Sequence, residues 1–144
     1  MSTDEAAVRQ TITDWLASMK ALDFAAGQQF WDRDFPGLVY QPEEHVVPMT
    51  DWAQLQRYWQ GVSGHVEAVP EWDEITTDVA VLGDAAFGFS RLSTKIKLRD
   101  AEPTFDGQVR CSFVLRRTPA GWRLVHYHES RLVGVEEALA SLTG

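Results

Sequence analysis

The segment TPAGWRLVHYHESRL, residues 118–132, follows the run QVRCSFVLRR, residues 108–117. Both runs are rich in β-branched and aromatic residues, and the Pro and Gly between them are typical of a turn, so the two runs predict a β-hairpin. If TPAG is the connecting loop, the register places Arg110 directly opposite Glu129. A slip of one residue would turn every side chain to the other face of the sheet. The unslipped register is favoured because it opposes two opposite charges.

This register divides the hairpin into two faces. One face carries both histidines with a largely apolar set, which consists of Cys111, Phe113, Leu115, Trp122, Leu124, His126 and His128. The other face carries two valines together with Arg110, Ser112, Tyr127 and Glu129. One face must meet the rest of the protein, and the other also needs cover, because so large an apolar patch is unusual on a monomer. We therefore expect a homodimer joined through Phe113, Leu115, Leu124 and His126.

The sequence before the hairpin predicts helices first and strands second. Apolar residues recur at helical spacing over 4–22, a shorter helix is expected over 24–31, and a third helix is expected to begin at Thr50 or Asp51. Residues 38–41 read as a short strand, and alternation over 72–82 and 85–98 adds two strands to the hairpin, making a four-stranded antiparallel meander. A further short helix is expected over 134–142. This order predicts an α+β fold in which the helices cover one face of the sheet.

Composition limits the classes of function. The chain has 144 residues, which predicts one domain spanning residues 1–144. The net charge of −8 argues against nucleic acid as a partner. No run is apolar and long enough for a membrane helix, and the acidic start lacks the features of a signal peptide, so we expect a soluble cytoplasmic protein. Cys111 is the only cysteine, which excludes a disulfide within one chain.

The order of elements and the terminal pattern W-x-x-V-H-x-H-x-S, here Trp122, Val125, His126, His128 and Ser130, resemble the NTF2-like superfamily. The similarity is greatest to SnoaL-like proteins and to the association domain of calcium/calmodulin-dependent protein kinase II. The resemblance implies an NTF2-like, cystatin-like cone, in which a strongly curved antiparallel sheet wraps a long helix and encloses an apolar cavity. It also implies that Glu129, Tyr127 and Arg110 face the cavity and that the histidines face outward, where members of the superfamily often dimerise.

Two positions depart from the patterns of known members. The position of Glu129 is commonly basic in the kinase association domains, so anion capture as in those domains is not expected here. Ketosteroid isomerases carry a general-base aspartate on the first strand, just before a proline, where this chain has Gln41. A glutamine cannot take up a proton as a carboxylate does.

The two histidines admit three interpretations. They would project from one face about 7 Å apart and could bind one metal ion. A third ligand would have to come from His45 or His65 in the helical half of the chain. Imidazoles hydrogen-bonded within a sheet interface are the favoured interpretation, and acid/base catalysis stays open. We expect neither a metal nor another cofactor.

The candidate site has a polar centre of Arg110 and Glu129, with Tyr127 as the group that orients a ligand. Further candidates for ligand contact are Trp15, Tyr40, His45, Trp59, Trp72 and Ser112. The leading hypothesis is a protein that binds a small hydrophobic metabolite and catalyses isomerisation, cyclisation or dehydration by proton transfer. The alternative is a noncatalytic binding or oligomerisation module. In that case Arg110 and Glu129 form a plain salt bridge and the aromatic side chains fill the cavity.

Overall fold

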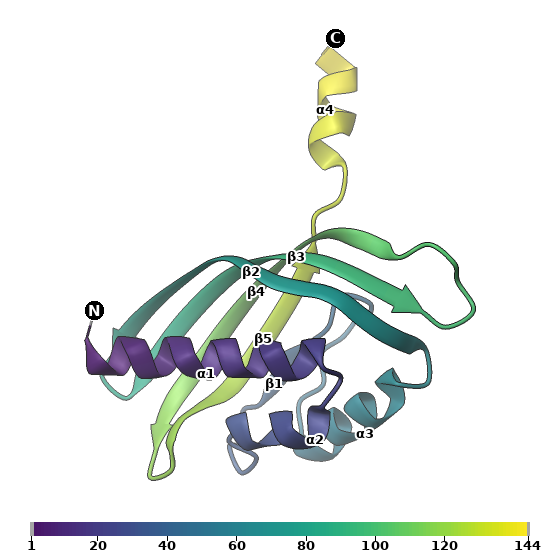
Figure 1. Ribbon diagram of the computed structural model, residues 1–144. Helices are drawn as coiled ribbons and strands as arrows, with labels where there is room; N and C mark the ends of the chain where they lie inside the picture. Colours follow the sequence, from purple (N-terminus) through teal and green to yellow (C-terminus); the bar gives the residue numbers. More distant parts are fainter. Residues whose placement is uncertain (1, 144) are drawn as a thin grey trace.

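Helices pack into the hollow of one strongly curved sheet in the computed structural model, which describes residues 2–143 (Figure 1). The sheet has five strands in the order β1-β5-β4-β3-β2. The elements are α1 (Thr3–Lys20), α2 (Phe24–Gly27), the 3-10 turn η1 (Gln28–Phe30), β1 (Val39–Gln41), α3 (Trp52–Val62), β2 (Val66–Leu82), β3 (Ala85–Leu98), β4 (Phe105–Thr118), β5 (Gly121–Arg131) and α4 (Val135–Thr143). The predicted α+β class is confirmed.

A capping side chain precedes each of the two long helices, and the one before α3 is Asp51, one of the two residues at which that helix was expected to begin. The Ser2 side chain accepts a hydrogen bond from the Glu5 backbone N at 3.1 Å, and the Asp51 side chain accepts one from the Gln54 backbone N at 2.9 Å. Each cap satisfies a backbone N–H that has no partner within its helix. One face of α1, which includes Ile12, is buried against the sheet.

The predicted meander is present, and two of its features were not predicted. β2 begins at Val66, well before the alternation becomes visible at residue 72. β1 pairs with β5 in parallel, with Tyr40 beside Tyr127, so the sheet is mixed. A strand of three residues carries too little pattern for its partner to be read from the sequence.

A β-bulge in β5 changes the register of the last hairpin. Leu115 pairs with Leu124, but the next pair is Val114 with His126, so Val125 is an extra residue. Beyond the bulge, every residue of β5 faces the opposite side from the one that an unbroken register gives it.

The bulge overturns the predicted pairing of Arg110 with Glu129. Glu129 lies opposite Cys111, and Arg110 lies opposite Ser130, to whose hydroxyl it donates a hydrogen bond of 3.3 Å. For the same reason the register was wrong to place Cys111 and Phe113 on one face with the histidines. The resemblance was wrong to place Arg110 inward, whereas Tyr127 and Glu129 face inward as the resemblance implied.

Phe113, Leu115 and Leu124 are buried inside the chain and cannot form the expected dimer contact with His126. The face directed toward the helices carries these three side chains together with Cys111, Tyr127 and Glu129, while the outer face carries Arg110, Ser112, His126 and His128.

The chain ends in a helix that leaves the body. α4 projects away from the sheet, and its apolar residues Leu139 and Leu142 are exposed (Figure 1). No helix within residues 2–143 is both long and apolar enough to cross a membrane.

Close contact between α1 and β3 leads to a first prediction. A Cβ atom on Gly88 would lie 2.4 Å from Ile12 Cδ1, so Gly88→Ala should destabilise the protein by about 1–3 kcal/mol through overpacking. Urea denaturation measures this loss. Because Ile12→Val removes the clashing methyl group, the same glycine substitution should cost much less in an Ile12→Val background.

Gly61→Ala is the matched control, because nothing lies within 4 Å of the added Cβ. Alanine is the better helix former at this position in α3, so the control should be neutral or slightly more stable. If Gly88→Ala lowers stability equally in the wild type and in the Ile12→Val variant, the proposed contact is contradicted.

Candidate functional site

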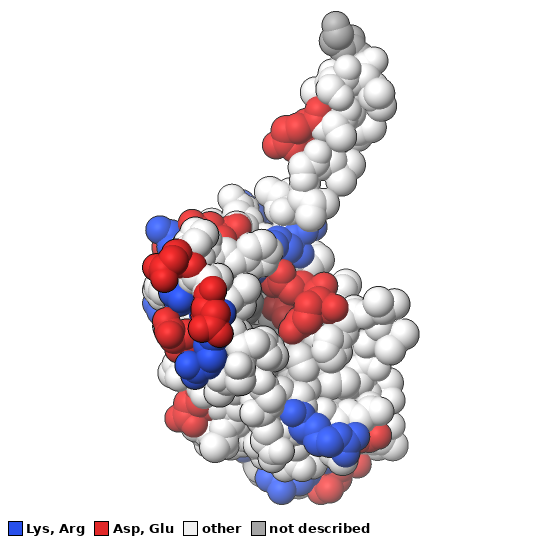
Figure 2. All heavy atoms as spheres, turned by 90° about the vertical axis from the view of Figure 1, so that its right-hand side faces the viewer, with Lys and Arg blue, Asp and Glu red and all other residues white. Residues whose placement is uncertain are grey.

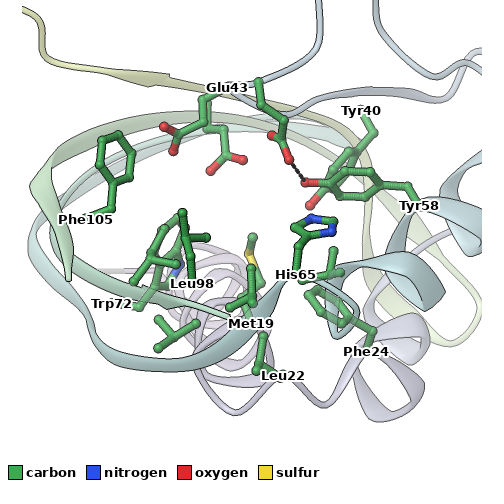
Figure 3. Close-up of a pocket in the computed structure, with 16 residues that line it drawn as sticks. Met19, Leu22, Phe24, Tyr40, Glu43, Tyr58, His65, Trp72, Leu98 and Phe105 are labelled. Carbon is green, nitrogen blue, oxygen red and sulfur yellow. Dashed lines mark hydrogen bonds between the residues drawn. The ribbon is translucent and has the colours of Figure 1, made fainter. Parts of the chain in front are cut away.

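A pocket of about 290 Å³ lies between the helices and the arm of the sheet formed by β2, β3 and β4 (Figure 3). Its lining is drawn from every layer of the fold and consists of Met19, Leu22, Phe24, Tyr40, Glu43, Glu44, Tyr58, Val62, His65, Val66, Val69, Trp72, Ile96, Leu98, Phe105 and Glu129. Figure 3 shows the carboxylates on one side, opposite Met19, Leu22, Trp72 and Leu98. The pocket is therefore apolar on one wall and acidic on the other.

Glu129 is the buried carboxyl group of this pocket, with 6% of its surface exposed. The bulge turns it inward on β5. The Tyr127 hydroxyl donates a hydrogen bond of 3.0 Å to Glu129 Oε2, and the Cys111 thiol lies 3.3 Å from the same hydroxyl oxygen. Tyr127 is wholly buried and does not line the pocket. Tyr127 therefore fixes the position of the Glu129 carboxyl group from the side that faces the core.

The surroundings of Glu129 raise its pKa to about 8. Burial is the largest cause, and the negative charges of Glu43 and Glu44 add to it. Hydrogen bonds from the Tyr127 hydroxyl and the Glu43 backbone lower the pKa in part. Such a group can give or take a proton near neutral pH, as general acid/base catalysis requires. The predicted partner Arg110, which would have kept Glu129 ionised, lies on the other face of the sheet.

Arg131 is the cation near the acidic wall, and its charge is already neutralised. Its Nε and Nη2 donate to the two carboxylate oxygens of Glu43 at 2.5 and 2.9 Å, and its Nη1 donates to Thr94 Oγ1 at 3.0 Å. The guanidinium also lies 4.4 Å from the centre of the Phe105 ring. A bidentate pair of this kind fixes both side chains in place.

The mouth of the pocket is formed by the loop after β1 and by the end of α3. The Tyr58 hydroxyl donates to Glu44 Oε2 at 2.8 Å, and the His45 ring stands edge-on to Tyr58 at 5.1 Å. His65, which is exposed, lines the pocket at the same end. Figure 2 shows a group of acidic side chains beside a hollow on this face.

The structure brings together part of the predicted site. Tyr40, Trp72 and Glu129 line the pocket, Tyr127 supports Glu129, and His45 borders an adjoining groove that shares Glu44, Tyr58 and His65 with the pocket. Trp15 and Trp59 are buried in the core, with ring centres 5.5 Å apart. Arg110 and Ser112 lie on the outer face of β4 and do not belong to the pocket.

Many residues of the site were not predicted from sequence, among them the polar residues Glu43, Glu44, Tyr58 and Arg131. Glu43, Glu44 and Tyr58 come from a loop and a helix whose position against the sheet has no local signal. Arg131 did have one, because it follows Tyr127 and Glu129 at the two-residue period of a strand face. Gln41, which occupies the position of the general base in ketosteroid isomerases, donates to the carbonyls of Pro42 and His45 and shapes the loop.

The two histidines lie outside this site. His126 and His128 are on the outer face, where partial burial, together with the charge of His128, lowers the pKa of His126. Within residues 2–143, no group of three His, Cys, Asp or Glu side chains could hold a metal ion.

Comparison with known proteins adds a family and a fold. The sequence profile of the SnoaL-like domain matches residues 8–134. No protein with a curated description matches the chain.

Among solved structures, a candidate dehydratase of the NTF2-like family from Streptomyces avermitilis superposes with a TM-score of 0.80, at 19% identity, over 92% of this chain and 99% of that one. An NTF2-like superfamily protein from Salmonella enterica serovar Typhimurium gives a TM-score of 0.80 at 21% identity, over 92% and 94%. A ketosteroid isomerase-like protein from Erwinia carotovora gives 0.77 at 15% identity, over 93% and 100%. At these identities the superpositions show the fold alone, and it is the fold that the sequence resemblance implied.

The raised pKa of Glu129 predicts how stability depends on pH. Folding raises this pKa from 4.5 to about 8, so the folded protein keeps a proton that the unfolded chain releases between these values. The contribution to stability is complete below the lower value and is lost as pH rises through the upper one. Glu129→Gln stays neutral throughout. Its stability relative to wild type should therefore increase by a few kcal/mol between about pH 5 and about pH 9, measured by urea denaturation.

Tyr127→Phe tests the cause. It removes a hydrogen bond that lowers the pKa of Glu129, so in this variant the loss of stability should continue to higher pH. A stability difference between Glu129→Gln and wild type that does not change with pH would contradict the buried, protonated state of Glu129.

Proposed function

The chain belongs to the SnoaL-like domain family, and we propose that it binds a small hydrophobic metabolite in this pocket and acts on it by proton transfer at Glu129. The observation that carries the proposal is a carboxyl group that is buried, lines a pocket and titrates near neutral pH. Structural groups rarely combine all three properties, whereas catalytic acids and bases often do.

The chemistry needs only one group that changes its proton. As a carboxylate, Glu129 takes a proton from a carbon of the substrate. As an acid, it returns that proton to another carbon, which gives isomerisation, or to a leaving hydroxyl, which gives dehydration. The two kinds of reaction are consistent with the names of two proteins of the same fold, a candidate dehydratase and a ketosteroid isomerase-like protein. Tyr127 serves as a positioning residue, because its hydroxyl reaches Glu129 and not the pocket.

A second proposal concerns the partner. The outer face of the sheet exposes Phe87, Phe89 and Ile75 by 44–45% each, and the ladder sets Phe87 in one row with Val114 and His126. An apolar band of this kind needs cover, and a second copy of the chain can supply it with the same band about a two-fold axis. The proposed homodimer thus forms through the outer face of the sheet. Phe113, Leu115 and Leu124, which were first expected at the interface, are not part of it.

The catalytic proposal predicts exchange of carbon-bound protons. A panel of cyclic and aromatic ketones is incubated with the protein in D₂O, and loss of the proton signals next to the carbonyl is followed by NMR. Exchange by wild type should rise with pH and level off above the Glu129 pKa of about 8. Glu129→Gln should reduce the rate at least about 100-fold while ligand binding survives.

Glu102→Gln is the control for this assay, because this glutamate is exposed in the loop between β3 and β4 and should leave the rate unchanged. Exchange that is equally fast in wild type and Glu129→Gln would overturn the role of Glu129.

The dimer proposal predicts that Phe87→Asp combined with Phe89→Asp gives folded monomers in sedimentation equilibrium, because both side chains are exposed within one chain. Leu82→Asp, at the exposed turn between β2 and β3, should leave the dimer intact. Wild-type protein that sediments as a monomer, or a double variant that stays dimeric, would refute this interface.

A further inference from the structure

We propose that the molecule held in this pocket is a hydrophobic amine, bound as its ammonium ion against Glu44 and the rings of Tyr58 and Tyr40. This inference rests on the proposed function, because it names the chemical class of the metabolite that the pocket takes. Four observations support it: the acceptor-rich wall, the balance of charge, the Tyr40 hydroxyl, and the size of the apolar wall.

The polar wall of the pocket consists almost entirely of oxygen atoms. They belong to the side chains of Glu43, Glu44, Glu129, Tyr40 and Tyr58, and the other polar lining groups are the His65 imidazole and the Trp72 indole. Carboxylate oxygens accept hydrogen bonds and donate none when ionised. A ligand that complements this wall is therefore rich in donors, and an ammonium group offers three with a positive charge.

Glu44 lies at the exposed end of the pocket, where solvent rather than a cation of the described chain surrounds its charge. Arg131 neutralises Glu43 through two hydrogen bonds, but Glu44 accepts only from the Tyr58 hydroxyl. Within the described part of the chain, no Lys or Arg lines the pocket and Glu44 forms no salt bridge. An anionic ligand would be repelled by these carboxylates, whereas an ammonium ion could form an ion pair with Glu44.

Tyr40 marks where the polar end of a ligand would lie. Only 1% of the residue is exposed, it lines the pocket, and its hydroxyl donates to no acceptor among residues 2–143. Figure 3 shows the hydroxyl ends of Tyr40 and Tyr58 pointing toward the pocket. This hydroxyl interacts with the Trp59 side chain, and its oxygen can also accept a hydrogen bond from an ammonium group at the pocket. The two aromatic rings, 5.6 Å apart, add the attraction of their π-faces for a cation.

The apolar wall of the pocket determines the kind and size of the uncharged part of the ligand. Met19, Leu22, Val69, Ile96 and Leu98 offer hydrocarbon surface, and the volume of about 290 Å³ admits one ring with a short side chain. A ligand with an apolar body and one charged end therefore matches the two walls of the pocket.

An ammonium group would also favour the base form of Glu129. A positive charge close to a carboxyl group stabilises the carboxylate and so lowers its pKa. The negative charges of Glu43 and Glu44 have the opposite effect in the free protein. Binding of an amine would thus release the proton from Glu129 and prepare it to act as a base.

The test compares three probes of almost equal shape: 4-phenylbutylamine, 4-phenylbutan-1-ol and 4-phenylbutanoate. Affinity is measured by calorimetry, and the site of binding is checked by the shift of the Trp72 indole N–H signal in NMR spectra. We expect the amine to bind at least about tenfold more tightly than the alcohol, with the carboxylate weakest. Glu44→Gln should remove most of the preference for the amine, and Glu102→Gln should keep it.

The outcomes separate this inference from the proposed function. If the alcohol binds in the pocket as tightly as the amine, or the carboxylate binds most tightly, the amine class is wrong and a hydrophobic ligand site remains. A preference for the amine that Glu44→Gln does not reduce, or that maps away from Trp72, also overturns the inference. If none of the three probes binds up to its solubility limit, the proposed function fails with it.

Discussion

The bulge at Val125 is the constraint on which the site depends. Leu124 and Val125 are consecutive and both buried, which a regular strand with one covered face cannot achieve. The extra residue reverses the direction of all later side chains in β5. Tyr127, Glu129 and Arg131 therefore turn toward the helices. Without the bulge, the histidines would enter the core and the acidic group of the pocket would face outward.

The inward turn places a carboxyl group at the edge of an aromatic core. Tyr127 contacts Tyr40 and Trp15 at ring distances of 5.0 and 6.3 Å, so the hydroxyl that holds Glu129 is itself held by packed rings. A buried carboxyl group is much less costly when it is protonated than when it is charged, and this is why burial is the largest cause of its raised pKa. Closely packed aromatic rings prevent the surroundings of Glu129 from rearranging around a charged carboxylate. The raised pKa of Glu129 therefore depends on the packing of the core.

The sequence could predict the elements better than their contacts. Capping residues and hydrophobic periods located α1, α3 and the meander, and resemblance to a family supplied the curved sheet and the inward direction of Tyr127 and Glu129. The register failed at one residue, because a bulge needs no glycine or proline and leaves no mark in a run such as RLVHY. Contacts such as Glu43 with Arg131 join segments 88 positions apart, and their formation depends on how the loop after β1 folds over the sheet.

The acidic groups of the site come from two separate parts of the chain. The sheet supplies the acidic group through β5, while the loop after β1 supplies the charges of Glu43 and Glu44, which raise its pKa further. Arg131 forms an ion pair with Glu43, whereas Glu44 lies at the mouth and accepts a hydrogen bond from the Tyr58 hydroxyl. A change confined to this exposed loop can therefore alter both the proton affinity of Glu129 and the charge that an incoming ligand meets, while the sheet stays the same. Proteins that share this sheet can differ in chemistry for that reason, since loops tolerate substitution far better than a packed core does.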